Sequence, residues 1–313
     1  MTAQWIATRE AFGDTLKEMG SKYKDLVVFD ADLSQSTKTC EFAKSFPNRF
    51  FNMGVAEQNM FTAAAGLSTT GLIPFVSTYA VFAAYKACEQ IRTFIAYPEL
   101  NVKIAVSHGG ITPGTDGVTH QATEDLSIMR SIPNLTVVMP ADAVATRTLV
   151  EKAYQIKGPI YLRFTKCPVP VIYPKNDNDF YFGKARIIKE GKQISLVAIG
   201  DMVYQALQAA EDLEKDGIHA RVIDMHTLKP LDCDCLKKIA CDSISILTIE
   251  DNTILGGLGG AVCEYYAENF QIPVYRIGLQ DIFAESGEYH QLLDKYGLNS
   301  KAIVLRVKNI LNR

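Results

Sequence analysis

The sequence predicts an α/β protein with two doubly wound domains, each built on a mostly parallel sheet. Short apolar segments, typical of buried parallel strands, alternate with segments of helical periodicity along nearly the whole chain. The chain has 313 residues, of which 48% are hydrophobic and 21% charged, and this is more than one ordinary core usually holds. The alternation breaks once, after residue 167, which favours two domains.

The first domain is expected over residues 1–167. Its first helix is predicted at residues 5–20, where apolar side chains recur near one face. Residues 26–30 form a continuous apolar run, which indicates a buried strand followed by a polar loop. The further predicted strands are residues 49–53, 74–78, 102–107, 135–139 and 160–164, and the further predicted helices are residues 57–67, 79–95, 124–130 and 143–156.

The second domain is expected over residues 187–313. Three prolines and a polar run at residues 168–186 predict an extended linker before it. The strand and helix patterns then resume. The predicted strands are residues 194–199, 220–224, 244–249 and 274–277, and helices are predicted at residues 203–215, near residues 302–311 and between the strands.

Composition excludes several classes of partner. The net charge is −3 and the lysines and arginines are scattered, which argues against nucleic acid and anionic membranes as partners. No signal peptide is recognisable at the N-terminus, and no apolar run has the length of a membrane span. Seven cysteines without C-x-x-C spacing predict free thiols. We therefore expect a cytoplasmic protein without a metal site of its own.

Polar side chains gather in the loops that follow the strands of the first domain, where open α/β sheets place their active sites. No P-loop, G-x-S-x-G, zinc motif or Cys/His pair accompanies them. The residues alone therefore predict an enzyme subunit with an incomplete site. The candidate side chains in these loops are Asp32, Ser36, Glu57, Tyr79, His108, Asp116 and His120.

An acid and an aromatic stripe each allow two interpretations. Glu57 follows Gly54 at the start of a predicted helix, where it either stabilises the helix dipole or acts as a chemical group shielded from solvent. Tyr79, Phe82 and Tyr85 recur every three residues, which is typical of core packing but also suits a floor for a planar ring.

Two further loops differ in what they support. His108 and His120 share one glycine-rich loop with Asp116, and this clustering favours a functional role. The run from Gly256 to Gly260 superficially resembles a dinucleotide-binding loop. It lacks the last glycine of that motif, and no acidic residue follows at the required distance. We expect a tight strand-to-helix turn there instead.

The whole chain resembles the C-terminal half of transketolase. The most specific matches are residues 54–59, 77–85 and 116–121, which read GVAEQN, STYAVFAAY and DGVTHQ. The resemblance implies a pyrimidine-binding domain for thiamine diphosphate followed by a transketolase C-terminal domain.

The resemblance also implies roles around the cofactor. Glu57 would be catalytic: it would hydrogen-bond N1′ of the aminopyrimidine and so help the cofactor lose its thiazolium C2 proton. Burial would keep this carboxyl able to hold a proton. Tyr79, Phe82 and Tyr85 would surround the aminopyrimidine, and Asp32 would belong to the same cofactor site.

The resemblance implies a substrate site with an anionic end. His120, as a second catalytic residue, and Asp116 would contact the hydroxyls of the donor sugar. An imidazole, a hydroxyl and two guanidinium groups would grip a terminal phosphate or sulfonate. These four residues are His108, Ser36, Arg9 and Arg163.

A motif that transketolases carry is absent from the sequence. They bind the diphosphate and its Mg or Ca ion with a Gly-Asp-Gly motif in an N-terminal domain, and no Gly-Asp-Gly occurs among the 313 residues. The resemblance thus implies a split transketolase, an α2β2 heterotetramer, whose partner, a transketolase N-terminal-section subunit, supplies the metal and diphosphate site. Its reaction would transfer a two-carbon ketol unit between a ketose phosphate and an aldose phosphate, as in pentose phosphate metabolism.

Other readings stay open. The β subunit of a 2-oxo acid dehydrogenase has the same two domains but matches less well around residues 116–121. Deoxyxylulose-phosphate synthase shares the A-E-Q and D-G-x-T-H strings, although it is normally one fused chain. A non-catalytic binding or regulatory subunit is the third alternative, and the intact Glu57 argues against it.

Overall fold

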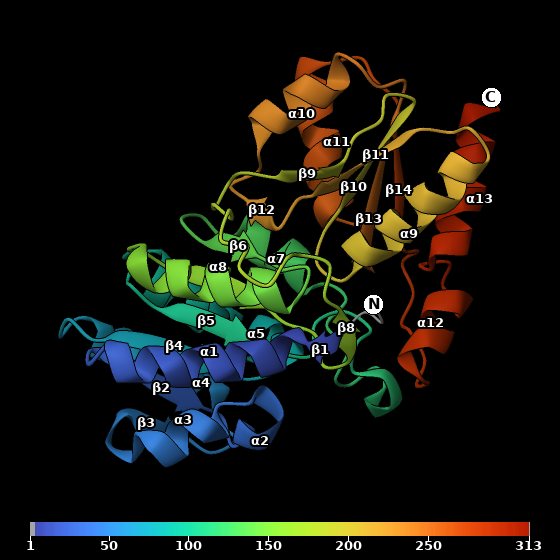
Figure 1. Cartoon of the computed structure of the whole chain (residues 1–313). Coiled ribbons are helices and arrows are strands. Elements are labelled where there is room, and N and C mark those ends of the chain that lie inside the picture. The colour runs from blue at the N-terminus through green and yellow to red at the C-terminus, as the bar shows by residue number, and fades with distance from the viewer. Residues whose placement is uncertain (1–3, 313) are drawn as a thin grey trace.

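A computed structural model describes residues 4–312 and contains two large, mostly parallel sheets flanked by helices, as predicted, beside a small two-stranded sheet (Figure 1). The larger sheet has seven strands in the order β12-β6-β7-β5-β4-β2-β3, and all of its strand pairs except β12 with β6 are parallel. Its strands are β2 (Leu26–Asp30), β3 (Phe50–Asn52), β4 (Ile73–Ser77), β5 (Lys103–Val106), β6 (Thr136–Val138), β7 (Ile160–Arg163) and β12 (Thr227–Lys229).

Helices cover both faces of the larger sheet, and α1 packs side by side with α8 on one of them (Figure 1). The helices of this half are α1 (Thr8–Lys22), α2 (Ser34–Thr37), α3 (Cys40–Ser45), α4 (Glu57–Ser68), α5 (Ala80–Lys86), α6 (Cys88–Gln90), α7 (Asp125–Ser131) and α8 (Ala143–Gln155). Short 3₁₀ turns lie at Pro47–Arg49 and Gly114–Asp116.

The smaller sheet has five strands in the order β14-β13-β10-β11-β9, with β9 antiparallel at one edge. Figure 1 shows α9 and α13 on one side of this sheet and α10 and α11 on the other. The elements are β9 (Arg186–Lys189), β10 (Ile194–Ala198), β11 (Ala220–Asp224), β13 (Ile246–Thr253), β14 (Val274–Leu279), α9 (Met202–Lys215), α10 (Cys233–Ala240), α11 (Leu258–Asn269), α12 (Tyr289–Lys295) and α13 (Ser300–Leu311).

The two halves are joined more closely than the sequence indicates. Strand β12 follows β11 in the chain, yet it leaves the smaller sheet and pairs with β6 of the larger one. Both clusters of buried apolar side chains contain residues from both halves. The division at residues 168–186 therefore remains a prediction, because strand pairing and core packing cross it.

Two expectations about local structure were wrong. Residues 79–95 do not form one helix: α5 ends at Lys86, Ala87 departs from helical geometry, and a π-helical turn occupies Ile91–Ala96. The N-terminal residues Trp5–Ala7 form strand β1 instead of the start of a helix, because they pair antiparallel with β8 (Pro168–Pro170). The expected linker thus begins as a strand, and tertiary pairing overrides the local helical periodicity.

The carboxyl ends of β2, β4, β5 and β7 lie along one edge of the larger sheet, because these strands are parallel and adjacent. The loops at this edge carry the candidate side chains. In residues 4–312, no helix is long and apolar enough to cross a membrane.

Candidate active site

Glu57 is the first residue of α4, and its side chain is buried, with 4% of its surface exposed. The chain enters the helix through Gly54, whose φ of 70° lies in the left-handed region that favours glycine. No backbone amide among the described residues donates a hydrogen bond to the Glu57 carboxylate; its ion-pair partner is Lys86 Nζ, 3.6 Å away. The carboxylate therefore does not cap the helix by a hydrogen bond.

A pocket of about 480 Å³ lies beside Glu57. The Lys86 ammonium group also lies 4.3 Å from the ring centroid of Phe82, so it links the carboxylate to the aromatic residues of α5. A planar ring that stacks on this face of Phe82 must displace the ammonium group. The pocket is lined by Val55, Ala56, Glu57, Gln58, Asn59, Tyr85 and Lys86.

Four rings pack together at the sheet edge, and we call them the ring cluster: Tyr79, Phe82, His108 and His120. The Tyr79 ring stacks on His108 with centroids 3.7 Å apart and on Phe82 at 5.5 Å. His120 contacts both Tyr79 and Phe82, at 5.7 and 5.8 Å. The structure thus brings the N-cap residue of α5, a residue within α5 and two residues of the 108–122 loop into one cluster.

His108 is held in an unusual state. Its φ of 64° is rare for a residue with a side chain, and such strain is common at functional sites. Burial, aided by the positive charges of Arg9 and Lys166, lowers the pKa of His108 to about 2. Its Nδ1 is hydrogen-bonded to Ser107 Oγ, 2.8 Å away. The imidazole is therefore neutral and fixed in orientation.

Positive charge gathers near His108. Arg9 Nη1 donates to the carbonyl oxygen of Ser36 at 2.9 Å, and the buried Arg9 Nε has no hydrogen-bond partner within residues 4–312. Burial lowers the pKa of Arg9. Lys166 Nζ donates to Asp116 Oδ2 at 2.7 Å. An unpartnered guanidinium donor near a neutral imidazole and an ammonium group suits an anionic ligand.

The sequence interpretation missed Lys166. It lies three residues beyond the end of β7, in the strand-end loop where active-site residues of parallel sheets gather. The position of Lys166 after a strand could have marked it as a candidate from the sequence. Its ion pair with Asp116 could be seen only in the structure.

The expectation for Arg163 is corrected. Its side chain is completely buried, so it cannot reach a substrate phosphate. Its Nε lies 3.0 Å from Asp125 Oδ2, and its Nη1 donates to Asp251 Oδ1 at 2.7 Å. Arg163 is the last residue of a strand buried along its whole length, and its guanidinium group serves two buried carboxylates instead of a ligand.

Two other predicted residues lie at the margin of the site. Asp32 is exposed and accepts a hydrogen bond from Asn52 Nδ2 at 2.9 Å, so it borders the loop that leads to Glu57. Tyr85 lines the pocket beside Glu57 with 57% of its surface exposed, and burial of its hydroxyl near Glu124 raises its pKa to about 12.

The glycine run of the second domain holds no dinucleotide site. The Glu250 carboxylate accepts hydrogen bonds from the amides of Leu258 and Gly259, both at 2.8 Å, at the N-terminus of α11. A bound phosphate would need these same amides. The rejection of such a site from sequence is consistent with this contact.

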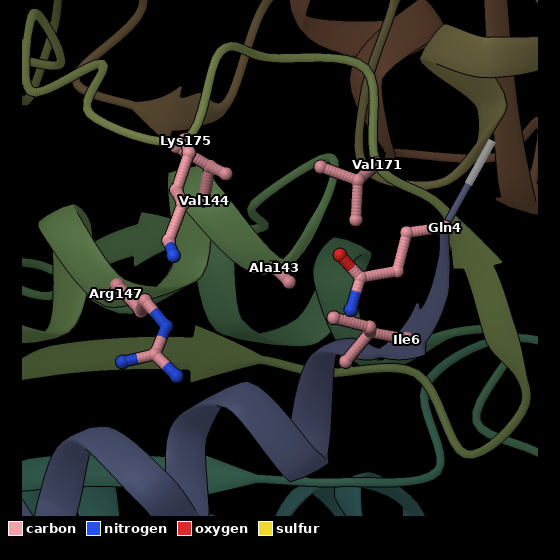
Figure 2. A pocket seen from close by; sticks show the side chains of 7 residues that line it. All are labelled: Gln4, Ile6, Ala143, Val144, Arg147, Val171 and Lys175. Atoms are coloured by element: carbon pink, nitrogen blue, oxygen red, sulfur yellow. The ribbon is translucent and has the colours of Figure 1, made fainter. Parts of the chain in front are cut away.

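A second pocket, of about 450 Å³, lies away from the ring cluster (Figure 2). It opens between β1, the start of α8 and the segment that follows β8. Figure 2 shows the Arg147 and Lys175 side chains on one side and Gln4 and Ile6 on the other. None of the predicted site residues lines this pocket.

The residues present fit one end of a thiamine cofactor. Glu57, the pocket beside it and the faces of the ring cluster can receive an aminopyrimidine ring. Among residues 4–312, no group of three or more His, Cys, Asp or Glu side chains could hold a metal ion.

Comparison with known proteins assigns both halves of the chain. Residues 4–170 match the family described as transketolase, pyrimidine binding domain, and residues 183–303 match transketolase, C-terminal domain. A putative transketolase C-terminal section of Methanocaldococcus jannaschii is 46% identical over 96% of this chain and 94% of its own length. The 6-deoxy-6-sulfo-D-fructose transketolase subunit of Clostridium sp. is 38% identical over 99% and 95%.

A solved structure agrees with these matches. A split gene transketolase, described as an inactive beta4 tetramer, superposes with a TM-score of 0.90 and 48% identity, over 99% of both chains. The resemblance drawn from residues 54–59, 77–85 and 116–121 is thereby confirmed, as is the fold class.

Proposed function

The chain belongs to the transketolase family, and we propose that it is one subunit of a split transketolase that depends on thiamine diphosphate. The reaction would transfer a two-carbon ketol unit from a ketose with an anionic tail to an aldose phosphate. The single observation that carries this proposal is the buried Glu57 carboxylate, which lines a pocket and pairs with Lys86 beside Phe82 of the ring cluster.

Thiamine diphosphate, when bound, would supply the carbon nucleophile and electron sink for this transfer. Glu57 would hold a proton at N1′ of the aminopyrimidine, and its burial would keep water from competing for that hydrogen bond. Phe82 would offer a ring face once the Lys86 ammonium group moves away. His120, which contacts Phe82 and Tyr79, would reach the donor sugar from the opposite loop.

A separate N-terminal-section subunit would supply the diphosphate and metal site, in a cytoplasmic α2β2 assembly. Exposed apolar side chains near Glu57 support the proposal that the partner subunit covers this surface. Val55 is 74% exposed and Tyr85 is 57% exposed. Glu124, next to Tyr85, lines a neighbouring pocket with Leu255 and Phe283, the latter 76% exposed. Exposed apolar groups of this kind are typical of protein interfaces. The inactive tetramer of the 48% identical chain also fits a subunit that needs a partner.

The substrate would carry a phosphate or a sulfonate. Arg9, His108 and Ser36 would bind this group as expected from sequence, and Lys166 would take the place expected for Arg163. Asp116, held by Lys166, would accept hydrogen bonds from sugar hydroxyls. This cluster favours a sugar with an anionic tail over the substrates of a 2-oxo acid dehydrogenase. Because one relative is described as a 6-deoxy-6-sulfo-D-fructose transketolase subunit, both phosphate and sulfonate tails are tested below.

The first test is cofactor binding with and without the partner subunit. In titration calorimetry with thiamine diphosphate and Mg²⁺, we expect no heat of binding for this chain alone, because its sequence holds no Gly-Asp-Gly motif for the diphosphate. The reconstituted pair should bind the cofactor. With xylulose 5-phosphate and ribose 5-phosphate it should form a seven-carbon ketose phosphate, detectable by mass spectrometry. Tight binding by the lone chain would rule out the split site.

The second test concerns the anionic tail. Arg9→Gln should raise KM for a phosphorylated acceptor by about 10- to 100-fold, the range for losing a charge-assisted hydrogen bond, and should affect the unphosphorylated aldose much less. Lys38→Gln is the matched control, because Lys38 lies near the same helices but pairs with Glu10. Equal effects of Arg9→Gln on KM for both acceptors would show that Arg9 does not bind the phosphate. Repeating the comparison with a sulfonated sugar separates the two anions.

A further inference from the structure

The loop of residues 108–122 carries three of the proposed substrate contacts, and we call it the substrate loop. Its backbone is costly to hold in one conformation. His108, Gly110, Gly114 and Gly117 all have positive φ, and glycine loses more conformational freedom than other residues when it is fixed. Some other part of the molecule must therefore fix the loop if Asp116 and His120 are to meet a sugar in a defined geometry.

The base of the substrate loop rests on a buried ion pair between the two halves of the chain. Gly110 and Ala122 exchange backbone hydrogen bonds of 2.8 and 3.0 Å, which close the loop. Arg163 Nη2 donates to the carbonyl oxygen of the same Ala122 at 2.9 Å. A Cβ at Gly110 would collide with the Asp251 carboxylate, so that carboxylate packs directly against the loop backbone.

Asp251 belongs to the C-terminal domain, since it lies in β13 of the smaller sheet, whereas Arg163 lies at the end of β7 in the larger sheet. Their atoms Oδ1 and Nη1 are 2.7 Å apart, and both side chains are fully buried. Such a pair holds its geometry, because breaking it would leave a buried charge without a partner. Asp125 adds a second carboxylate on the side of the larger sheet.

Two further parts of the substrate loop, Gln121 beside its base and the outer turn at residues 114–117, are held from the same domain. Gln121 Nε2 donates to the carbonyl oxygen of Glu285 at 3.0 Å. The amide of Gly287 donates to the carbonyl oxygen of Gly114 at 3.4 Å. A Cβ at Gly117 would collide with the Ser286 hydroxyl. Residues 285–287 therefore lie against the outer turn of the loop, while Asp251 lies against its base.

We infer that the C-terminal domain positions the substrate loop, with Asp251 acting through Arg163 at the base and residues 285–287 acting at the tip. Asp251 and Arg163 are positioning residues in this arrangement. The inference gives the C-terminal domain a role in the site without any contact of its own with cofactor or sugar. It rests on the proposed function only for the identity of the substrate, because the packing of the loop is independent of the reaction.

The first experiment measures loop mobility and needs no activity. Asp251→Asn keeps the size of the side chain and removes its charge. In hydrogen–deuterium exchange of the reconstituted complex, we expect peptides covering residues 109–122 to exchange roughly tenfold faster, as for a weakened charge-assisted hydrogen bond. Peptides of β10 should be unchanged. Asp242→Asn is the matched control, because Asp242 pairs with Arg221 at 2.7 Å within the C-terminal domain.

Two outcomes would overturn the inference. One is unchanged exchange of residues 109–122 in a folded Asp251→Asn protein. The other is faster exchange throughout the chain, since a general loss of stability would not distinguish this loop.

The second experiment leaves the buried charges intact, and it serves if Asp251→Asn does not fold. Gln121→Met removes the donor to Glu285 while keeping the side-chain length. We expect KM for the donor ketose to rise about fivefold, a usual size for the loss of one coupled contact, with a smaller change in KM for the acceptor. Unchanged donor KM would contradict the inference. A wild-type pair without ketol transfer would instead refute the proposed function, and the exchange experiment would still decide the positioning role.

Discussion

Glu57→Gln should lower the turnover of the reconstituted enzyme by about 1,000-fold, within the range for loss of a general acid–base group. Glutamine keeps the shape of the side chain and can still hydrogen-bond a pyrimidine nitrogen, but it cannot hold or release the proton. The site is buried, so water has little access with which to replace the lost group. Turnover is measured as two-carbon transfer with saturating cofactor and both sugars.

The control separates chemistry from assembly. Glu89→Gln makes the same change at an exposed glutamate on α6 and should leave turnover unchanged. Sedimentation of each variant with the partner subunit should give the wild-type assembly, because the substitution leaves the exposed apolar surface intact. Near-normal turnover of Glu57→Gln would show that this carboxyl is only a helix-start residue.

Arg163→Ala should destabilise the folded chain by about 3–5 kcal/mol, the cost of leaving buried charges without a partner. The guanidinium group pairs with Asp125 and Asp251, and all three side chains are fully buried. Burial already raises the pKa of Asp125, and removing Arg163 raises it further. When a carboxyl has a higher pKa in the folded than in the unfolded protein, the free energy of unfolding falls as pH rises. The loss of stability caused by Arg163→Ala should therefore be larger at pH 8 than at pH 5.

Chemical denaturation at both pH values measures this effect, and Arg147→Ala is the surface control. Arg147 pairs with Asp14 and Glu18, but all three side chains are about half exposed, so its removal should cost less than about 1 kcal/mol. A stable Arg163→Ala variant with impaired binding of phosphorylated sugars would restore the original assignment of Arg163 to the anion site.

The sequence predicted the alternation of strands and helices because each buried strand of a parallel sheet needs its own continuous apolar run. The strands at residues 26–30 and 220–224 were placed at their observed bounds. The sequence did not predict β1 and β12. These strands are short and gain their conformation only by pairing with strands distant in the chain. The sequence also predicted one helix over residues 79–95, because the helical periodicity continues there. The structure breaks that helix at Ala87, where the backbone leaves helical geometry.

For the candidate site, the sequence pointed to loops whose side chains the structure brings together, and it could not say which of these side chains point outward from the core. Arg163 and Lys166 are both cations near the end of β7, and a pattern of residue types does not distinguish them. The first points into the core toward two carboxylates, and the second reaches out to Asp116. Their exchange of roles depends on carboxylates at Asp125 and Asp251, far away along the chain.

By itself the sequence determined the fold class, the family and the strand-end loops, because these depend on local periodicity and on short motifs. Only the tertiary structure decided that four rings meet in one cluster, that Arg163 is structural and that the C-terminal domain lies against the substrate loop. These features arise from contacts between segments that lie far apart in the chain, such as Gln121 and Glu285, which are 164 residues apart. Burial and charge pairing at such contacts depend on the packed neighbours of a residue, and its neighbours in sequence do not specify them.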